Sequence, residues 1–142
     1  MTTSPPEYKK PIPRPANPTL TKPFWDAAKQ HKLIVPRCKA CSRYHFYPRE
    51  QCPYCFSMDL EWVPAAGKAR VYTFSVVHQP ENRNFTEDCP YVHAIVQLTE
   101  GVLMPTAIVG CAPEEVHVDM EVEPAFDDVT PEWTLVKFKP VA

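Results

Sequence analysis

Four cysteines constrain what this chain can fold into more than any other feature of its sequence. They follow the pattern C-x2-C-x10-C-x2-C, formed by Cys38, Cys41, Cys52 and Cys55. Each C-x-x-C pair can direct two thiolates at one ion, and two pairs complete a tetrahedral shell of four sulfurs. That shell leaves no position open for water or substrate, so we expect a structural zinc ion. Its binding would contribute on the order of 10 kcal/mol to folding, which so short a loop could not obtain from burial.

Other interpretations of the cysteines stay open at this point. Two disulfides would suit a secreted mini-domain, but the N-terminal stretch MTTSPPEYKKPIPRP lacks the apolar core of a signal peptide. A redox motif seldom occurs as two closely spaced pairs. No apolar run approaches the length of a membrane span. We therefore expect a cytoplasmic protein, since a reducing compartment suits a thiolate site, with no membrane contact.

Proline content and hydrophobic pattern divide the 142 residues into three parts. Residues 1–20 form a proline-rich arm, expected to be extended and either disordered or wrapped around a partner. Residues 21–66 hold a short helix and the metal ribbon, with Thr21 as the expected N-cap and Pro23 near the first turn.

Residues 67–142 change to a pattern of period two, which indicates strands. In the first of them Tyr72, Phe74 and Val76 are expected on one face, and Pro105 should place the third at an edge or a bulge. Five short strands with one helical turn after the third fit an OB-type barrel. The strands are expected at residues 69–77, 91–98, 102–109, 120–126 and 135–138.

Aromatic side chains are concentrated in the half of the chain that holds the ribbon. A ribbon of about 45 residues should not be able to enclose all of them. Aromatic residues together with arginine are typical of interface hot spots, so we expect contact with a larger protein. The candidates are Phe24, Trp25, Tyr44, Phe46 and Tyr47.

Charge is distributed unevenly along the chain. Residues 1–69 carry eleven Lys and Arg against five Asp and Glu (+6), residues 70–142 carry four against twelve (−8), and the sum is the net charge of −2. The two halves could have different partners or could attract each other. The acidic barrel half argues against nucleic acid, because phosphate contacts need cations. A nucleic-acid-binding module stays an alternative through the basic ribbon half.

The order of helix, four-cysteine ribbon, hinge and barrel resembles a family of small zinc-ribbon plus OB-fold proteins associated with acyl-CoA enzymes. The resemblance covers about residues 20–140 and includes PFW at 23–25, FYPR at 46–49, CPYC at 52–55 and VYTFSVVH at 71–78. It implies a mainly β fold with an N-terminal helix, a rubredoxin-like zinc ribbon and a five-stranded C-terminal OB-type barrel.

The same resemblance implies a function. Family members are non-catalytic subunits of thiolase-type acyl-CoA enzymes, which break or form carbon–carbon bonds, so we expect a hetero-oligomer built around a catalytic dimer. Partnership with a thiolase-like aldolase or an enoyl-CoA hydratase, in steroid or aromatic acid breakdown, is the alternative that the resemblance implies. No catalytic residue is expected here, because four of the six cysteines bind metal and the five histidines are scattered singly.

Binding of coenzyme A, shared with the partner, is a further implication of the family. Two or three cations suffice for its 3′-phosphate and diphosphate. The basic ribbon half offers Arg37, Lys39, Arg43 and Arg49. The competing interpretation is that these side chains solubilise the surface or form ion pairs.

Some positions depart from the family pattern. Ser42 and Phe56 follow the second cysteine of each pair, where ribbons often have glycine because φ is positive there. Asp119 also stands where glycine is usual. We therefore expect the turns after the cysteines to be strained or differently formed, with the metal ligands intact.

Overall fold

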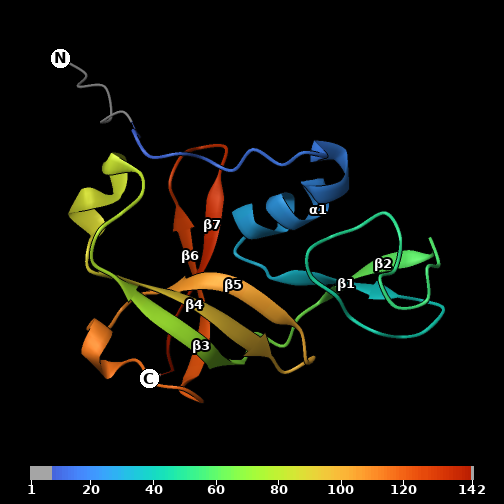
Figure 1. The fold of residues 1–142 in the computed structure, drawn as a ribbon. Coiled ribbons are helices and arrows are strands. Elements are labelled where there is room, and N and C mark those ends of the chain that lie inside the picture. The colour runs from blue at the N-terminus through green and yellow to red at the C-terminus, as the bar shows by residue number, and fades with distance from the viewer. Residues whose placement is uncertain (1–7, 142) are drawn as a thin grey trace.

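An extended arm, one helix, a two-stranded ribbon and a closed five-stranded barrel follow one another in the computed structural model, which describes residues 8–141 (Figure 1). This arrangement confirms the predicted mainly β fold. The part of the predicted arm at residues 1–7 lies outside the described residues. In chain order the elements are α1 (Pro18–Lys29), β1 (Ile34–Cys38), β2 (Leu60–Pro64), β3 (Ala69–Val77), η1 (Arg83–Asp88), β4 (Tyr91–Leu98), β5 (Leu103–Ile108), η2 (Pro113–Glu115), β6 (Glu121–Asp128) and β7 (Thr134–Pro140).

Helix α1 begins earlier than the sequence indicated. Its N-cap is Asn17, whose side-chain oxygen accepts a hydrogen bond from the backbone N–H of Leu20 at 3.2 Å, and Pro18 takes the first helical position. Asn followed by Pro is a strong start signal, because one residue caps and the next has no N–H to lose. The prediction of Thr21 as the cap was therefore wrong. Pro23 lies inside the helix, past its first turn.

The ribbon is a single antiparallel pair that holds the metal loop between its strands. Strands β1 and β2 run from Ile34 opposite Pro64 to Cys38 opposite Leu60. The cysteine-bearing loop therefore begins and ends at one end of this hairpin. No helix among residues 8–141 combines the length and the apolar character needed to cross a bilayer.

The barrel has the strand order β3-β4-β5-β7-β6 and closes through β3 and β6, where Ala69 lies opposite Val122. Strand β5 meets β7 in parallel only at Ile108 and Phe138. The hydroxyl of Thr106 extends that contact by donating to the carbonyl of Val136 at 2.9 Å. At Pro105 the strand pairs with β4 alone, which confirms the edge that its missing N–H predicted.

A β-bulge in β3 changes which side chains face the barrel interior. The pairing with β4 shifts register between Val71 and Thr73, so Tyr72 has no opposite residue. The extra residue switches the inward face from Val71 before the bulge to Phe74 after it. Tyr72 is 54% exposed. Its predicted place on the same face as Phe74 and Val76 was wrong for this reason.

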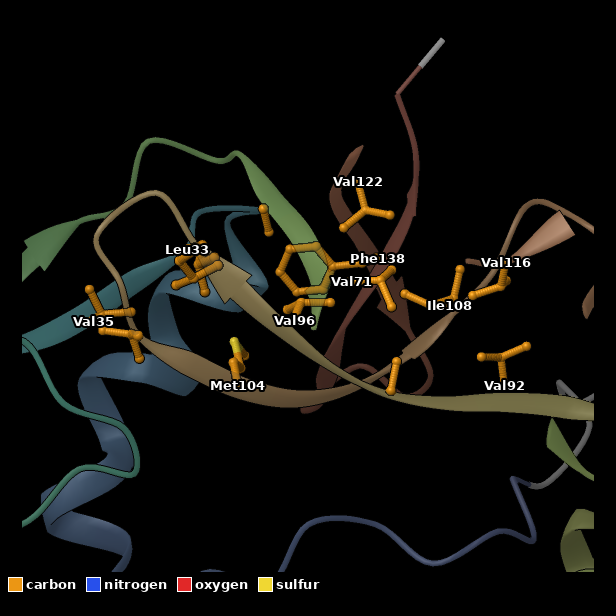
Figure 2. Close-up of a cluster of buried hydrophobic side chains, with 14 of the residues drawn as sticks. Leu33, Val35, Val71, Val92, Val96, Met104, Ile108, Val116, Val122 and Phe138 are labelled. Carbon is orange, nitrogen blue, oxygen red and sulfur yellow. The ribbon is translucent and has the colours of Figure 1, made fainter. Parts of the chain in front are cut away.

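One hydrophobic core joins the barrel to the ribbon. Fully buried Val71, Val96 and Phe138 lie at its centre, and Leu33 and Val35 reach it from the ribbon side (Figure 2). Each fully buried side chain of this size stabilises the fold by about 1.5–3 kcal/mol relative to an exposed one. Gly67 lies between the ribbon and the barrel, and the same cluster contains residues on both sides of it. We therefore expect loss of structure in the ribbon to destabilise the barrel as well.

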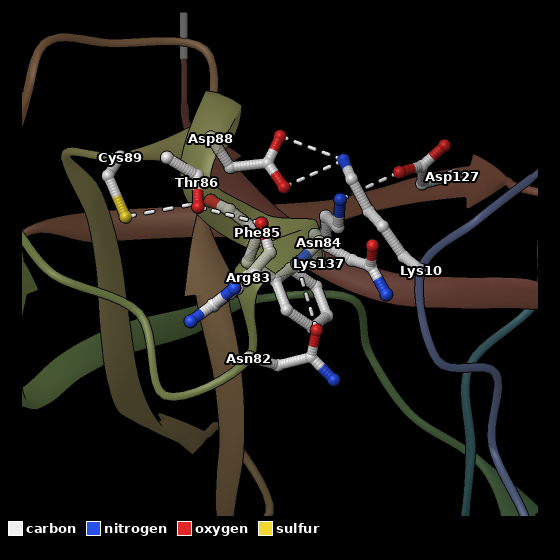
Figure 3. Close-up of polar contacts among 10 residues, drawn as sticks. All are labelled: Lys10, Asn82, Arg83, Asn84, Phe85, Thr86, Asp88, Cys89, Asp127 and Lys137. Atoms are coloured by element: carbon white, nitrogen blue, oxygen red, sulfur yellow. Dashed lines mark hydrogen bonds and ion pairs between the residues drawn. The ribbon is translucent and has the colours of Figure 1, made fainter.

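The arm is held against the long connection between β3 and β4. Lys10 Nζ contacts both carboxylate oxygens of Asp88, at 2.8 and 2.7 Å, next to the ion pair of Lys137 with Asp127 (Figure 3). The hydrogen bond to Asp88 is the main reason that the pKa of Lys10 is raised. The connection itself forms the short helix η1, whose first N–H groups are capped by Asn82. Residues 8–17 thus lie on the molecule rather than away from it.

Candidate metal centre and docking cleft

The four predicted ligands come together at the end of the ribbon. The sulfur of Cys38 lies 3.5 Å from that of Cys55, and the sulfur of Cys41 lies 3.7 Å from that of Cys52. All four lie within 4.8 Å of one another. A tetrahedral zinc ion with Zn–S bonds of about 2.3 Å places its sulfurs about 3.8 Å apart. The residues present therefore fit a closed structural zinc site, as the spacing predicted.

Backbone N–H groups in the knuckles favour the thiolate form of Cys38 and Cys52, whereas at Cys55 the N–H of Ser57 is outweighed by burial and by hydrogen bonds with the other three cysteines, which raise its pKa to about 12. The N–H of Cys41 points at the sulfur of Cys38 at 3.5 Å and lowers its pKa. Burial raises the pKa of Cys52, but the N–H groups of Cys55 and Tyr54 outweigh it and lower that pKa to about 6. Zinc binds thiolates and releases their protons, so these N–H groups favour metal binding.

Both turns that follow the cysteine pairs have the backbone of ordinary zinc knuckles. Ser42 and Phe56 each have φ of +64°, and their N–H groups donate to the carbonyls of Cys38 and Cys52. The turns therefore have the usual conformation, and Ser42 and Phe56 are strained in it because they are not glycine. A non-glycine residue in this left-handed region costs about 1–2 kcal/mol. Asp119 takes the same conformation, with φ of +67°.

A histidine is buried between the two knuckles without a polar partner. His45 is 4% exposed, and neither ring nitrogen has a hydrogen-bond partner among the described residues. Burial, helped by the positive charge of Arg49, lowers the pKa of His45. His45 therefore binds a proton less readily in the folded chain than in the unfolded chain, where it is protonated below about pH 6.5. The free energy of unfolding should fall as the pH drops below that value.

Replacing His45 with leucine is expected to remove this penalty. Leucine has a similar volume and lacks the two buried ring nitrogens that have no hydrogen-bond partner. His45→Leu should therefore leave the free energy of unfolding at pH 7 unchanged or raise it by about 1 kcal/mol. The difference in free energy of unfolding between His45→Leu and the natural chain should increase from pH 7 to pH 5.5, as measured by urea unfolding at both values. Protonation of the zinc ligands affects both chains equally. His93→Leu, at an exposed position of β4, is the control; an equal pH effect there would contradict the assignment.

A cleft of about 710 Å³ lies where the arm, α1, the ribbon loop, β5 and β7 meet. Its walls are mostly apolar. Four of the five predicted interface aromatics line it: Phe24, Trp25, Phe46 and Tyr47. Pro13 and Arg14 of the arm, and Leu135 and Lys137 of β7, complete it. The sequence did not indicate these residues, because nothing local shows that the arm folds back over the barrel.

The aromatic residues of the cleft have different accessibility. Phe24 is 6% exposed and belongs to the core, so the expectation that it stays free for a partner was wrong: α1 packs on the barrel as well as on the ribbon. Trp25 lies edge-on to Phe24 and to Trp133, with centroid distances of 5.0 and 5.2 Å. Tyr47 is 62% exposed and stacks on Phe46. Tyr47 is therefore the aromatic residue of the cleft best placed to meet another protein.

The remaining predicted interface residue lies elsewhere. Tyr44 is partly buried under the guanidinium of Arg37, at 5.6 Å from the ring centre, and does not line the cleft.

The four cations proposed for coenzyme A are not equivalent. Arg37 contacts Glu61 at 3.5 Å and Lys39 contacts Asp59 at 3.9 Å. Arg43 instead lies over the ring of Tyr54, at 4.9 Å from its centre. Within residues 8–141, neither Arg43 nor Arg49 forms an ion pair. Ion pairing thus accounts for two of the four positions, and exposed pairs of this kind are weak.

Comparison with protein families matches both halves of the chain. The model of the ChsH2 rubredoxin-like zinc ribbon domain matches residues 25–61, and that of the ChsH2 C-terminal OB-fold domain matches residues 62–127. A solved chain from the "Ltp2-ChsH2(DUF35) aldolase" is 39% identical, with a TM-score of 0.81 over 91% of this chain and 100% of that one. The chain belongs to the ChsH2, or DUF35, family of zinc-ribbon and OB-fold proteins.

Three relatives of this chain differ in the protein that their names describe and in the share of their length that matches. A "probable enoyl-CoA hydratase alpha subunit" of Thermomonospora curvata is 41% identical over 90% of this chain but only 40% of its own length. A "DUF35 domain-containing scaffold protein" of Methanocaldococcus jannaschii is 41% identical over 69% of this chain and 70% of its own. The "benzoylsuccinyl-CoA thiolase subunit BbsA" of Geobacter metallireducens is 32% identical over 61% and 56%. The chain thus spans about two fifths of the hydratase subunit it matches.

Proposed function

We propose that this DUF35 protein is a non-catalytic accessory subunit of a thiolase-type acyl-CoA enzyme. The observation that carries the proposal is the apolar cleft, in which four of the five predicted interface aromatics lie beside the loop that carries the four cysteines. An exposed tyrosine on an apolar wall is a common anchor of protein interfaces. In the complex, the subunit would stabilise the catalytic chain and shape its acyl-CoA entrance.

A non-catalytic role is part of the proposal, and the reacting groups are assigned to the catalytic chain. Among residues 8–141, no hydrogen bond joins a histidine to a serine, threonine or cysteine, which nucleophilic catalysis would need. His31 contacts Asp128 at 2.9 Å, but both side chains are more than half exposed.

The names of the relatives support the same conclusion at the level of enzyme class. One is a thiolase subunit, one a scaffold protein and one part of a hydratase subunit. A thiolase-like aldolase is the second candidate for the catalytic chain. The solved chain that resembles 91% of this chain, over all of its own length, comes from an aldolase. Nucleic-acid binding has less support, because the barrel half is acidic and because Arg37 and Lys39 form ion pairs with carboxylates.

Co-expression with candidate acyl-CoA enzymes tests the proposal. This chain and a thiolase-like chain, each also expressed alone, are compared by affinity purification and gel filtration. We expect a stable hetero-oligomer, and higher thiolytic activity and thermal stability of the catalytic chain within it. A catalytic chain that is equally stable and active alone, and that does not retain this chain, would contradict the proposal. Co-purification with an aldolase or a hydratase alone would favour the second candidate.

Coenzyme A binding is the finer part of the proposal, and we assign a phosphate of coenzyme A to Arg49. The guanidinium of Arg49 lacks a carboxylate partner within residues 8–141, whereas that of Arg43 already lies over the ring of Tyr54. Replacing Arg49 with alanine should weaken coenzyme A binding by the complex about tenfold or more, because a hydrogen bond to a charged group contributes about 1.5–3 kcal/mol. Calorimetry measures this, with Arg70→Ala as the control, since Arg70 lies on the barrel beside Glu121. Equal affinity of Arg49→Ala and the natural complex for coenzyme A would rule the assignment out.

A further inference from the structure

The second zinc knuckle has an apolar tip that is more than half exposed. Tyr54 is 53% exposed, Phe56 68% and Met58 73%. These three side chains, here called the knuckle tip, lie within five residues of one another next to Cys55 and do not line the cleft. Large apolar side chains grouped on an exposed loop mark an interaction site more often than single ones do.

Phe56 imposes two costs on the folded chain and brings no visible gain. Its backbone is held at φ of +64° by its N–H bond to Cys52 and by the side-chain amide of Gln51, which donates to its carbonyl at 2.7 Å. Glycine would adopt this conformation freely. The ring is exposed, so it adds nothing to the core. Strain and exposure at the same residue point to a use outside folding.

The tip is already in a fixed arrangement before any partner arrives. Cys52 and Cys55, on either side of Tyr54, are zinc ligands, so the metal would hold the loop. The guanidinium of Arg43 lies over the Tyr54 ring at 4.9 Å and has no carboxylate partner among the described residues. An unpaired cation beside an apolar knob is complementary to an apolar pocket with carboxylates at its edge.

We propose that the knuckle tip inserts into such a carboxylate-edged apolar pocket on the catalytic chain, as a second contact separate from the cleft. Three side chains cannot supply the roughly 800 Å² per partner of a stable interface. A second copy of this chain joined through the tips alone would therefore not persist, and the tip must belong to a larger interface, which the cleft provides. This inference rests on the proposed association with a catalytic chain.

The two knuckles supply a matched pair of variants for the test. Phe56→Gly and Ser42→Gly relieve the same backbone strain at the same φ, but only the first removes a tip side chain. With zinc-loaded protein, both should melt at or above the temperature of the natural chain. Only Phe56→Gly should weaken binding to the purified catalytic chain, about tenfold or more. Arg43→Glu should weaken binding more than Arg43→Gln, because it places a carboxylate against the acidic edge.

The outcomes separate this inference from the proposed function. If Phe56→Gly binds the catalytic chain as tightly as Ser42→Gly does, the inference is wrong, while loss of binding in a cleft variant would still support the proposed function. If the natural chain binds no catalytic chain, the proposed function fails and this inference with it. Unchanged binding to the catalytic chain, with loss of binding to vesicles of phosphatidylglycerol and phosphatidylcholine, would assign the tip to a membrane surface and overturn the inference.

Discussion

Replacing Cys38 with serine should unfold the ribbon and produce the largest loss of stability of any single substitution in this chain. Cys38 is fully buried and ends β1, the strand that connects the metal site to the core. A tetrahedral zinc site contributes about 10–16 kcal/mol at pH 7, more than the total stability of most domains of this size. With three sulfurs left, the ion is held weakly, and the loop has little core of its own to keep it folded.

The effect should extend beyond the loop. Leu33 and Val35 belong to the same core cluster as the barrel residues, so a ribbon that unfolds exposes one side of that core. We expect the Cys38→Ser barrel to unfold at a lower temperature and the ribbon amides to exchange their hydrogens rapidly. Treatment of the natural chain with a chelator should reproduce both changes, and added zinc should reverse them.

Metal analysis and circular dichroism during heating measure the result. The natural chain should contain one zinc ion per molecule and Cys38→Ser much less. Cys111→Ser is the matched control, because Cys111 is partly buried and lies outside the four-sulfur cluster. Natural protein without stoichiometric metal, or a Cys38→Ser chain that melts like the natural one, would show that the four sulfurs do not hold a structural ion.

Replacing Tyr47 with alanine should cause the largest loss of partner binding. The Tyr47 side chain is 62% exposed and stacks on Phe46 at 4.7 Å, so it is held in place at the cleft without being needed for the core. Truncation of an aromatic hot spot costs about 2–4 kcal/mol of binding free energy, which is about 30- to 1000-fold in affinity. The folding stability of the free chain should change by less than about 0.5 kcal/mol.

The choice of Tyr47 over Trp25 makes this experiment interpretable. Trp25 packs against Phe24 and Trp133, so its removal would also loosen α1 and mix a folding defect with a binding defect. Tyr72→Ala is the control, since Tyr72 is 54% exposed at the β3 bulge and outside the cleft. Calorimetric or surface-based titration against the catalytic chain compares the variants. Equal affinity for Tyr47→Ala and the natural chain would remove the cleft from the interface.

Several features of the fold were predictable because they depend on residues close together in the chain. The metal ligands follow from cysteine spacing, and the strand expected at residues 91–98 from its alternation coincides with β4, whose buried residues alternate with exposed or partly buried ones. The missing N–H of Pro105 predicted an edge or a bulge, and the structure shows the edge. The start of α1 was misjudged although its signal, Asn17 followed by Pro18, is also local.

Other features depended on contacts between distant segments. A bulge is a property of two paired strands, so the reversal of Tyr72 is not visible in β3 alone. The burial of Phe24 depends on α1 reaching the barrel, and the cleft depends on the arm turning back to Asp88. None of these contacts leaves a periodic trace in the sequence.

The metal ligands and the barrel strands were predictable because sulfur spacing and residue alternation act over a few positions, and the family followed from the resemblance of the motifs. Which aromatic side chains belong to the core, and which are exposed at the cleft and the knuckle tip, became clear from the packing of the whole chain. Exposure depends on what packs against a residue from the rest of the chain. The packing of the helix, the arm and the barrel therefore singled out Tyr47 among the five aromatic candidates and added Phe56, which the sequence had not indicated.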